Sequence, residues 1–147
     1  MNKDIVGYTT GVFDLFHVGH LRLLQNAKDR CDRLIVGVST DELVETYKNK
    51  RPIIPYEERI EIVSALKCVD KVVPQTHRDK IASYHEIKFD LMFVGSDWKG
   101  SDLFNQVESE LSEYGVSVVY FEYTHHVSSS LLKSTLQAIY DGENSTS

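Results

Sequence analysis

Two histidines three positions apart, His17 and His20, are the side chains of this sequence best suited to chemistry. They follow a short apolar stretch at Ile5 and precede an amphipathic run that starts at Leu21, so we expect a strand, a tight turn and a helix. A helix N-terminus presents free backbone N–H groups and a partial positive charge. Since residues three apart share a helix face, both imidazoles can converge on one group of oxygens. The segment predicts an anion site, and phosphate is the expected anion.

Gly19, between the histidines, supports this interpretation because a side chain there would stand where a triphosphate must approach the backbone. An isolated histidine pair is more often a surface or core feature. The preceding Gly11-Val12-Phe13-Asp14, in a strand–turn–helix context, favours the phosphate site instead. A zinc pair fits less well, because helical zinc ligands need a spacing of i and i+4 and no cysteine or third histidine completes the set.

The composition describes an ordinary soluble globular chain of 147 residues, 41% hydrophobic and 26% charged. We expect one domain over residues 1–140 and a frayed tail over 141–147. The formal net charge is −6, and the cations form no long basic block, so nucleic acid is not the expected partner.

Cys31 and Cys68 stand alone on apolar faces, which fits a reducing cytosol better than a disulfide framework. The N-terminus carries no signal-peptide pattern, and no apolar run approaches the ~20 residues that span a bilayer. We therefore expect a cytoplasmic protein that does not enter a membrane.

Buried strands alternate with amphipathic helices along the chain, without repeats or an interdomain linker. After the first strand and helix, a helix is expected to begin with Ser39, Thr40 or Asp41 as its cap, before a cationic loop. Further strands are expected at 33–39, 70–74, 91–95 and 116–123, and further helices at 56–67, 80–88, 103–114 and after a loop at 124–128. This alternation predicts an α/β fold, a parallel five-stranded sheet with helices on both faces.

Ligands of such sheets bind beyond the carboxyl ends of the strands, at the switch point of the strand order. The loops that should meet there follow Gly11, Ser39, Gly95 and Tyr123. They carry the unusual polar residues of the chain.

His17-Val18-Gly19-His20 resembles the His-x-Gly-His signature of the nucleotidyltransferase superfamily, in which both imidazoles donate hydrogen bonds to nucleotide phosphates. From Tyr8 to Lys133 the chain resembles the cytidylyltransferase branch, and the glycerol-3-phosphate cytidylyltransferases most closely. Three further segments carry the resemblance: Lys67-Cys68-Val69-Asp70-Lys71-Val72 for Arg-Tyr-Val-Asp-Glu-Val, Gly95-Ser96-Asp97-Trp98 for Gly-Asp-Asp-Trp, and Val127-Ser128-Ser129-Ser130 for Ile-Ser-Thr-Thr.

The resemblance implies a Rossmann-like, doubly wound fold and transfer of CMP from CTP to a phosphorylated alcohol, glycerol 3-phosphate first among them, with release of pyrophosphate. The acceptor phosphate attacks the alpha phosphorus directly. Little acid–base chemistry is needed, because a phosphate monoester with a second pKa near ~6 is already ionised at neutral pH. Mg²⁺ is expected with the triphosphate, since protein cations alone neutralise it poorly. A homodimer with the 67–72 segment near the partner, and a role in making a cell-surface polymer or lipid precursor, are also implied.

The same resemblance assigns roles to individual residues. His17, His20 and Lys48 are expected to be catalytic, and no side chain is expected to hold a metal. The nucleotide-binding residues are expected to be Thr10, Gly11, Val12, Phe13, Gly19, Lys50, Arg59, Gly95, Asp97, Thr124, Val127, Ser128, Ser129 and Ser130. The acceptor-binding residues are expected to be Lys48, Lys67, Lys80 and Trp98.

Several of these residues have structural alternatives. Lys48 could be merely solvated, with Lys50 or Arg51 in its place, and Arg59 could pair with a neighbouring glutamate of its helix. Asp97 could shape the Trp98 loop instead of binding the nucleoside. The serines at 128–130 could cap the last helix, with or without also holding phosphates. Asp14 is expected to brace the motif turn, because a carboxylate beside a triphosphate would repel it.

The chain departs from the branch at Tyr123 and Thr124, which replace an arginine and a threonine, and at Val12, where the glycerol phosphate enzymes have threonine. His125, His126, Lys50 or Arg51 could supply the missing donors. Choline, ethanolamine, sugar and polyol phosphates therefore remain possible acceptors.

Two other functions stay open: an adenylyltransferase of the same fold that uses ATP, and a noncatalytic nucleotide sensor. The joint presence of His17, Gly19, His20 and Lys48 argues against the sensor, which has no need of transition-state donors. A class I synthetase fragment shares the histidine motif. Such an enzyme needs a much longer chain and a surface that binds tRNA, which the acidic composition of this chain does not favour.

Overall fold

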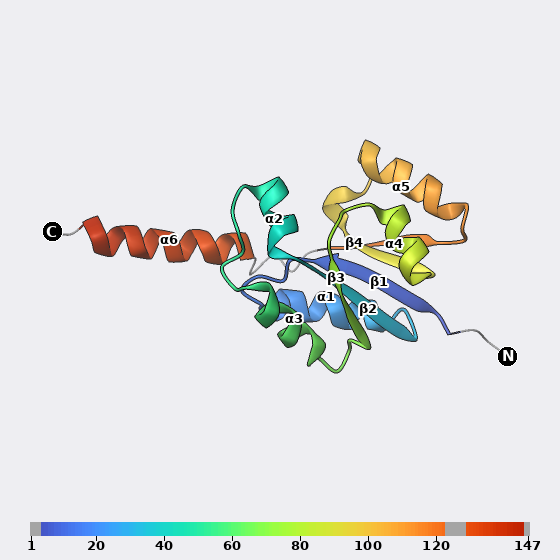
Figure 1. Cartoon of the computed structure of the whole chain (residues 1–147), viewed down its shortest axis with the longest axis horizontal. Helices are drawn as coiled ribbons and strands as arrows, with labels where there is room; N and C mark the ends of the chain where they lie inside the picture. Colours follow the sequence, from blue (N-terminus) through green and yellow to red (C-terminus); the bar gives the residue numbers. More distant parts are fainter. Residues whose placement is uncertain (1–3, 123–128, 146–147) are drawn as a thin grey trace.

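A five-stranded, all-parallel sheet in the order β3-β2-β1-β4-β5 forms the centre of the computed structural model, which describes residues 4–122 and 129–145 (Figure 1). In residues 129–132 and 143–145 only the backbone is described. The strands are β1 (Val6–Gly11), β2 (Arg33–Ser39), β3 (Lys71–Gln75), β4 (Leu91–Gly95) and β5 (Ser117–Phe121). The doubly wound, Rossmann-like α/β fold is confirmed, with the switch point between β1 and β4.

Helices cover both faces of the sheet, as expected (Figure 1). Within the described residues the helices are α1 (Val18–Lys28), α2 (Asp41–Lys48), α3 (Tyr56–Ser64), α4 (Lys80–Ile87), α5 (Asp102–Ser112) and α6 (Ser129–Ser145), with a 3₁₀ turn η1 (Ser96–Trp98). Leu24 of α1 and Val63 of α3 belong to one core cluster with Val36 of β2. Phe104 and Leu111 of α5 belong to the other, against which α4 packs. The two faces therefore have separate cores.

Local rules explain most of the element boundaries. Thr40 caps α2 by accepting the Leu43 N–H at 3.1 Å, and Asn49 ends that helix in the left-handed conformation (φ 57°), which asparagine tolerates. β4 covers the expected residues. α3 ends at Ser64 instead of residue 67, where the Ser64 hydroxyl bonds the Glu61 carbonyl and the chain turns towards β3.

α6 extends away from the sheet and runs to Ser145 (Figure 1). The expected frayed tail at 141–147 stays a prediction. Near its start, Lys133 reaches back to Asp14 in the turn after β1. In the part of the chain that the structure describes, no helix is long and apolar enough to cross a membrane.

Close packing of β1 against the end of α1 requires a glycine at position 7. A Cβ on Gly7 would lie 2.5 Å from Phe93 Cε2 and 2.8 Å from Cys31 Sγ. Gly7→Ala should therefore lower the free energy of unfolding by about 1–3 kcal/mol, the usual cost of overpacking a core. Gly142→Ala is the matched control, because its Cβ meets nothing within 4 Å and alanine favours a helix. Equal stabilities in urea titrations would contradict this packing argument.

Candidate active site

The turn between β1 and α1 has an unusual backbone. Phe13 (φ 55°) and Leu15 (φ 51°) both adopt the left-handed conformation on either side of Asp14. A Cβ on Gly11 would lie 2.9 Å from the Phe13 ring, so the glycine allows that ring to fold back against the strand end. Phe13 is buried, and its ring lies edge-on to His20 with 5.5 Å between centroids. A nucleotide could therefore meet only the backbone of Phe13, although a binding role was expected.

Both imidazoles use the same nitrogen to cap α1. His17 Nδ1 accepts the Gly19 N–H at 3.0 Å, and His20 Nδ1 accepts the His17 N–H at 3.2 Å. A neutral imidazole that accepts at Nδ1 carries its proton on Nε2. The two rings, stacked 4.1 Å apart, therefore each present an Nε2–H donor. The Gly19 N–H is engaged within the turn by this bond.

The donor of His17 is a buried polar group that lacks a protein partner. Among the described residues, His17 Nε2 is the buried side-chain nitrogen or oxygen without a hydrogen bond. Burying a donor without an acceptor is costly, so such groups usually meet a ligand or water. An acceptor oxygen from a bound molecule would satisfy it.

Burial also keeps the two rings neutral. It lowers the pKa of His17, and it lowers the pKa of His20 to about 4, with repulsion from His17 adding to the effect and Asp14 opposing it. Near neutral pH both rings are therefore uncharged in the free protein. They can act as hydrogen-bond donors without bringing a fixed positive charge into the core.

Asp14 ties the histidine turn to two distant segments. Its Oδ2 and Oδ1 accept the Ile53 and Ile54 N–H groups at 2.8 and 2.9 Å, and Lys133 Nζ lies 2.8 Å from Oδ2. Burial raises the pKa of Asp14, but the bonds from Lys133 and the two amides outweigh it and hold that pKa below its ordinary value. The expectation that Asp14 braces the turn is confirmed.

Arg59 was expected to bind the nucleotide, but its side chain instead bonds protein groups and braces the same turn. Its side chain has no exposed surface. The guanidinium donates to the carbonyls of Val12 (2.6 Å), Ser39 (2.8 Å) and Ile54 (2.8 Å), and pairs with Asp41 at 2.6 Å. It thereby joins the ends of β1 and β2 to the 49–55 loop. The partner is Asp41 rather than a glutamate of its own helix.

Lysines gather where this loop leaves α2. Burial lowers the pKa of Lys48, and repulsion from Lys133, Lys50 and Arg78 adds to it, with Asp14 opposing. Lys48 thus lies within electrostatic reach of both Lys133 and Lys50. Arg51 instead contacts carboxylates of α2, with Nε 3.0 Å from Glu45 Oε2, so it is less suited to replace Lys48.

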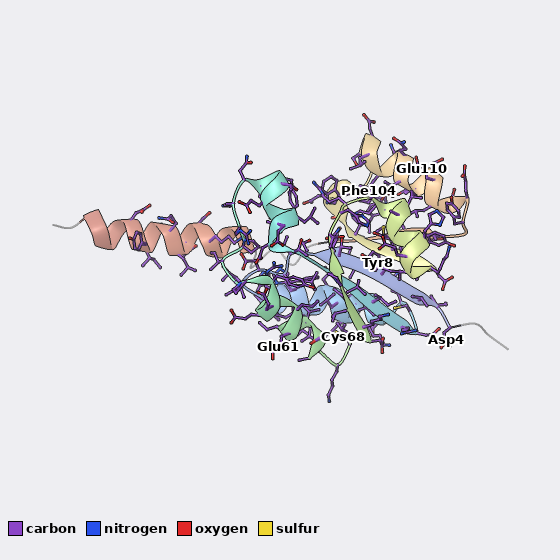
Figure 2. All side chains as sticks on the ribbon, in the orientation of Figure 1. Asp4, Tyr8, Glu61, Cys68, Phe104 and Glu110 are labelled. Carbon is purple, nitrogen blue, oxygen red and sulfur yellow. The ribbon has the colours of Figure 1, made fainter. Side chains whose placement is uncertain are left out.

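A cleft of about 600 Å³ opens at the carboxyl ends of β1 and β4, between α4 and α5. Figure 2 shows Phe104 and Glu110 on the α5 side of it. Six residues with expected binding roles line it: Thr10, Gly11, Val12, Lys80, Gly95 and Trp98. The histidines do not line it: the His20 ring packs against Phe13. The cleft lining nevertheless includes Leu23 of α1, the helix that His17 caps.

Lys80 fits the expected acceptor role. It begins α4 and lines the cleft, and no hydrogen bond or ion pair of its ammonium occurs among the described residues. Burial lowers the pKa of Lys80 to about 8, with repulsion from Arg78 adding and Asp79 opposing. A desolvated, unpaired ammonium is a strong candidate for holding an anion.

Lys67 does not come near the cleft. It follows α3 and precedes β3, so it lies at the amino end of that strand, whereas the cleft is at the carboxyl edge. The expected contact between Lys67 and the acceptor is therefore not supported within one chain. The strand expected at 70–74 already implied this position, whereas the acceptor role of Lys67 came from the resemblance alone.

Asp97 lies exposed in η1 directly after β4, near the cleft but outside its lining. Thr124, Val127 and Ser128, together with Tyr123, His125 and His126, lie outside the described residues. Ser129 and Ser130 begin α6, and their side chains are also outside the description.

The sequence interpretation missed Tyr47, Gln75, Arg78, Gln106 and Glu110, all of which line the cleft. For Arg78 a signal was present. It follows β3, and every loop at the carboxyl ends of a parallel sheet is a candidate for ligand binding.

The buried, neutral state of His20 gives a pH prediction. Its pKa is about 4 in the folded protein against about 6.5 in an unfolded chain, so the unfolded chain binds more protons between these values. Stability present above pH ~6.5 should be lost as pH falls towards ~4. The His20 ring proton should titrate near pH 4 in NMR spectra, and His20→Ala should flatten the stability curve in that window. A midpoint near 6.5 would contradict the buried geometry.

Comparisons with known proteins show the family of this chain. The cytidylyltransferase-like family model matches residues 8–137. A relative from Bacillus spizizenii strain W23, described as glycerol-3-phosphate cytidylyltransferase, is 36% identical over 138 residues, which cover 93% of this chain and 99% of the relative. The bifunctional protein HldE of Granulibacter bethesdensis is 39% identical over 99 residues, 67% of this chain but only 20% of HldE.

Solved structures share the fold. The lipopolysaccharide core biosynthesis protein from Thermoplasma volcanium GSS1 superposes with a TM-score of 0.69 at 28% identity, covering 85% of this chain and 100% of that one. Pantoate-beta-alanine ligase from Francisella tularensis has a TM-score of 0.58 at 14% identity, covering 83% and 60%, which shows the fold alone. The chain belongs to the cytidylyltransferase-like family and is a nucleotidyltransferase enzyme.

Proposed function

We propose that this enzyme transfers CMP from CTP to a phosphorylated alcohol, with glycerol 3-phosphate as the first candidate, and releases pyrophosphate. The observation that carries the proposal is the pair of neutral imidazoles whose Nε2–H donors are fixed by backbone bonds to Nδ1. The orphaned donor of His17 calls for an acceptor oxygen, and a triphosphate supplies several. The choice of substrates draws on the relative described as glycerol-3-phosphate cytidylyltransferase.

The proposed reaction needs positioning more than acid–base chemistry. The acceptor phosphate is already a dianion near neutral pH and attacks the alpha phosphorus directly. His17 and His20 donate to the triphosphate, and His20 stabilises the charge that develops on the alpha phosphoryl group. In this proposal Lys48, at the end of α2, bridges the two anions, and Lys80, which lines the cleft, holds the acceptor. The cations thus offset the repulsion between two negatively charged substrates.

Magnesium fits this site as an ion carried by the nucleotide. In the described segments, no group of three His, Cys, Asp or Glu side chains is placed to hold a metal, and Asp14 is engaged by Ile53, Ile54 and Lys133. Mg²⁺ commonly binds phosphate oxygens and keeps its waters, so few protein ligands are needed. When bound, it would neutralise triphosphate charge. We further propose that the enzyme works in the cytoplasm as a homodimer.

Pyrophosphate release tests the function directly. The four nucleoside triphosphates are each combined with glycerol 3-phosphate and with choline, ethanolamine, sugar and polyol phosphates in the presence of Mg²⁺. Release with CTP and glycerol 3-phosphate above all other pairs is expected. Release with ATP would instead identify an adenylyltransferase, and no release with any pair would favour a nucleotide sensor.

His20→Ala should lower kcat by roughly 10²–10³, as removal of one transition-state hydrogen-bond donor does, while the dissociation constant for CTP changes far less. His85→Ala is the matched control, because His85 is exposed on α4 and packs on Tyr84 and Tyr114 away from the cleft. Circular dichroism checks that both variants fold. Turnover of His20→Ala at the wild-type rate would refute the role of His20.

A further inference from the structure

A stacked pair closes one side of the cleft. The Arg78 guanidinium carbon lies 4.4 Å from the centre of the Tyr47 ring, within the range of a cation–π contact. Tyr47 belongs to α2, and Arg78 to the loop between β3 and α4, so the contact joins two elements distant in the sequence. Both side chains line the cleft.

The guanidinium has no carboxylate partner in the part of the chain that the structure describes. No ion pair or hydrogen bond of Arg78 occurs there, although Asp79 is its neighbour. Asp79 is engaged elsewhere, because its Oδ1 accepts the Ile81 and Ala82 N–H groups at 3.0 Å and so caps α4. The N–H donors of Arg78 are therefore left for solvent or for a ligand in the cleft.

Arg78 and Lys80 line this part of the cleft, and Lys48 Nζ lies 6.0 Å from the centre of the Tyr47 ring. Repulsion from Arg78 contributes to the lowered pKa of Lys80 and, to a smaller degree, to that of Lys48. Like charges held within reach of one another in a partly desolvated cleft are unfavourable unless an anion joins them. A phosphate monoester, with two charges and three free oxygens, suits such a set. The planar guanidinium can bind two of those oxygens at once.

We propose that Arg78 binds the phosphate of the acceptor together with Lys80, and that Tyr47 is the positioning residue that holds Arg78 in place. The proposal rests on the proposed function, since it names a ligand of the acceptor in that reaction. The acceptor is favoured over the triphosphate because Arg78 lines the cleft together with Lys80, whereas neither imidazole lines it. Lys48, from the same helix as Tyr47, lies within electrostatic reach of Arg78.

The test compares Arg78→Met with wild type at saturating CTP, then at saturating glycerol 3-phosphate. The KM for glycerol 3-phosphate should rise roughly ten- to hundredfold, the loss that one charge-assisted hydrogen-bonding partner gives, while the KM for CTP stays within about twofold. Arg30→Met is the matched control, because Arg30 also lies over an aromatic ring, Phe121 at 5.6 Å, but does not line the cleft.

Variants of Tyr47 separate positioning from simple loss of structure. Tyr47→Leu removes the ring face and should raise the KM for glycerol 3-phosphate with little change in the KM for CTP. Tyr47→Phe keeps the face and should restore the wild-type KM. Equal effects of the two variants would refute the positioning role.

Two outcomes would overturn the assignment of Arg78. An unchanged KM for glycerol 3-phosphate in Arg78→Met would show that Arg78 is no ligand, and a raised KM for CTP alone would assign it to the triphosphate. If wild type turns over no substrate pair, the proposed function fails separately. In that case calorimetry of glycerol 3-phosphate binding to wild type and to Arg78→Met tests the assignment of Arg78, and weaker binding to the variant is expected. Equal affinities, or no binding to either protein, would reject the site.

Discussion

Two hydrogen bonds from backbone N–H groups to imidazole nitrogens set the chemistry of this protein. Gly19 donates to His17, and the His17 N–H donates to His20, so each ring is used as a helix cap and as a ligand-binding group at once. Because Nδ1 accepts in both rings, Nε2 must donate in both. The turn that begins α1 thus fixes which ring nitrogen of each histidine carries the proton.

That turn is held by two buried charged groups. Asp14 accepts the amides of the 49–55 loop, and Arg59 donates to the carbonyls of Val12, Ser39 and Ile54. The left-handed residues on either side of Asp14 are unfavourable on their own and need such support. Because Lys50 lies in the loop that Asp14 braces and Lys48 directly precedes that loop, Asp14 links the histidine turn to the segment that carries both lysines.

The sequence predicted the fold because apolar runs bounded by turn residues mark the strands and helices. It predicted the brace at Asp14 because a carboxylate would repel an anion that approaches this turn. The sequence could not predict that Arg59 is buried, because a cation on an amphipathic helix usually faces solvent. The carbonyls that Arg59 binds lie on three other segments of the chain. The contact of Arg78 with Tyr47 joins two elements distant in the sequence, so residue spacing alone could not reveal it. The position of Lys67 at the amino end of β3, by contrast, followed from the strand expected at 70–74.

Nitrogen-detected NMR of the two histidines, with and without CTP and Mg²⁺, tests the central claim most directly. In the free protein both rings should be neutral at pH 7 with the proton on Nε2. Addition of CTP should shift the Nε2 signals of both rings and reveal couplings from those nitrogens to phosphorus across the new hydrogen bonds. Protonation at Nδ1 in the free protein, or Nε2 chemical shifts that do not change when CTP is added, would contradict the account.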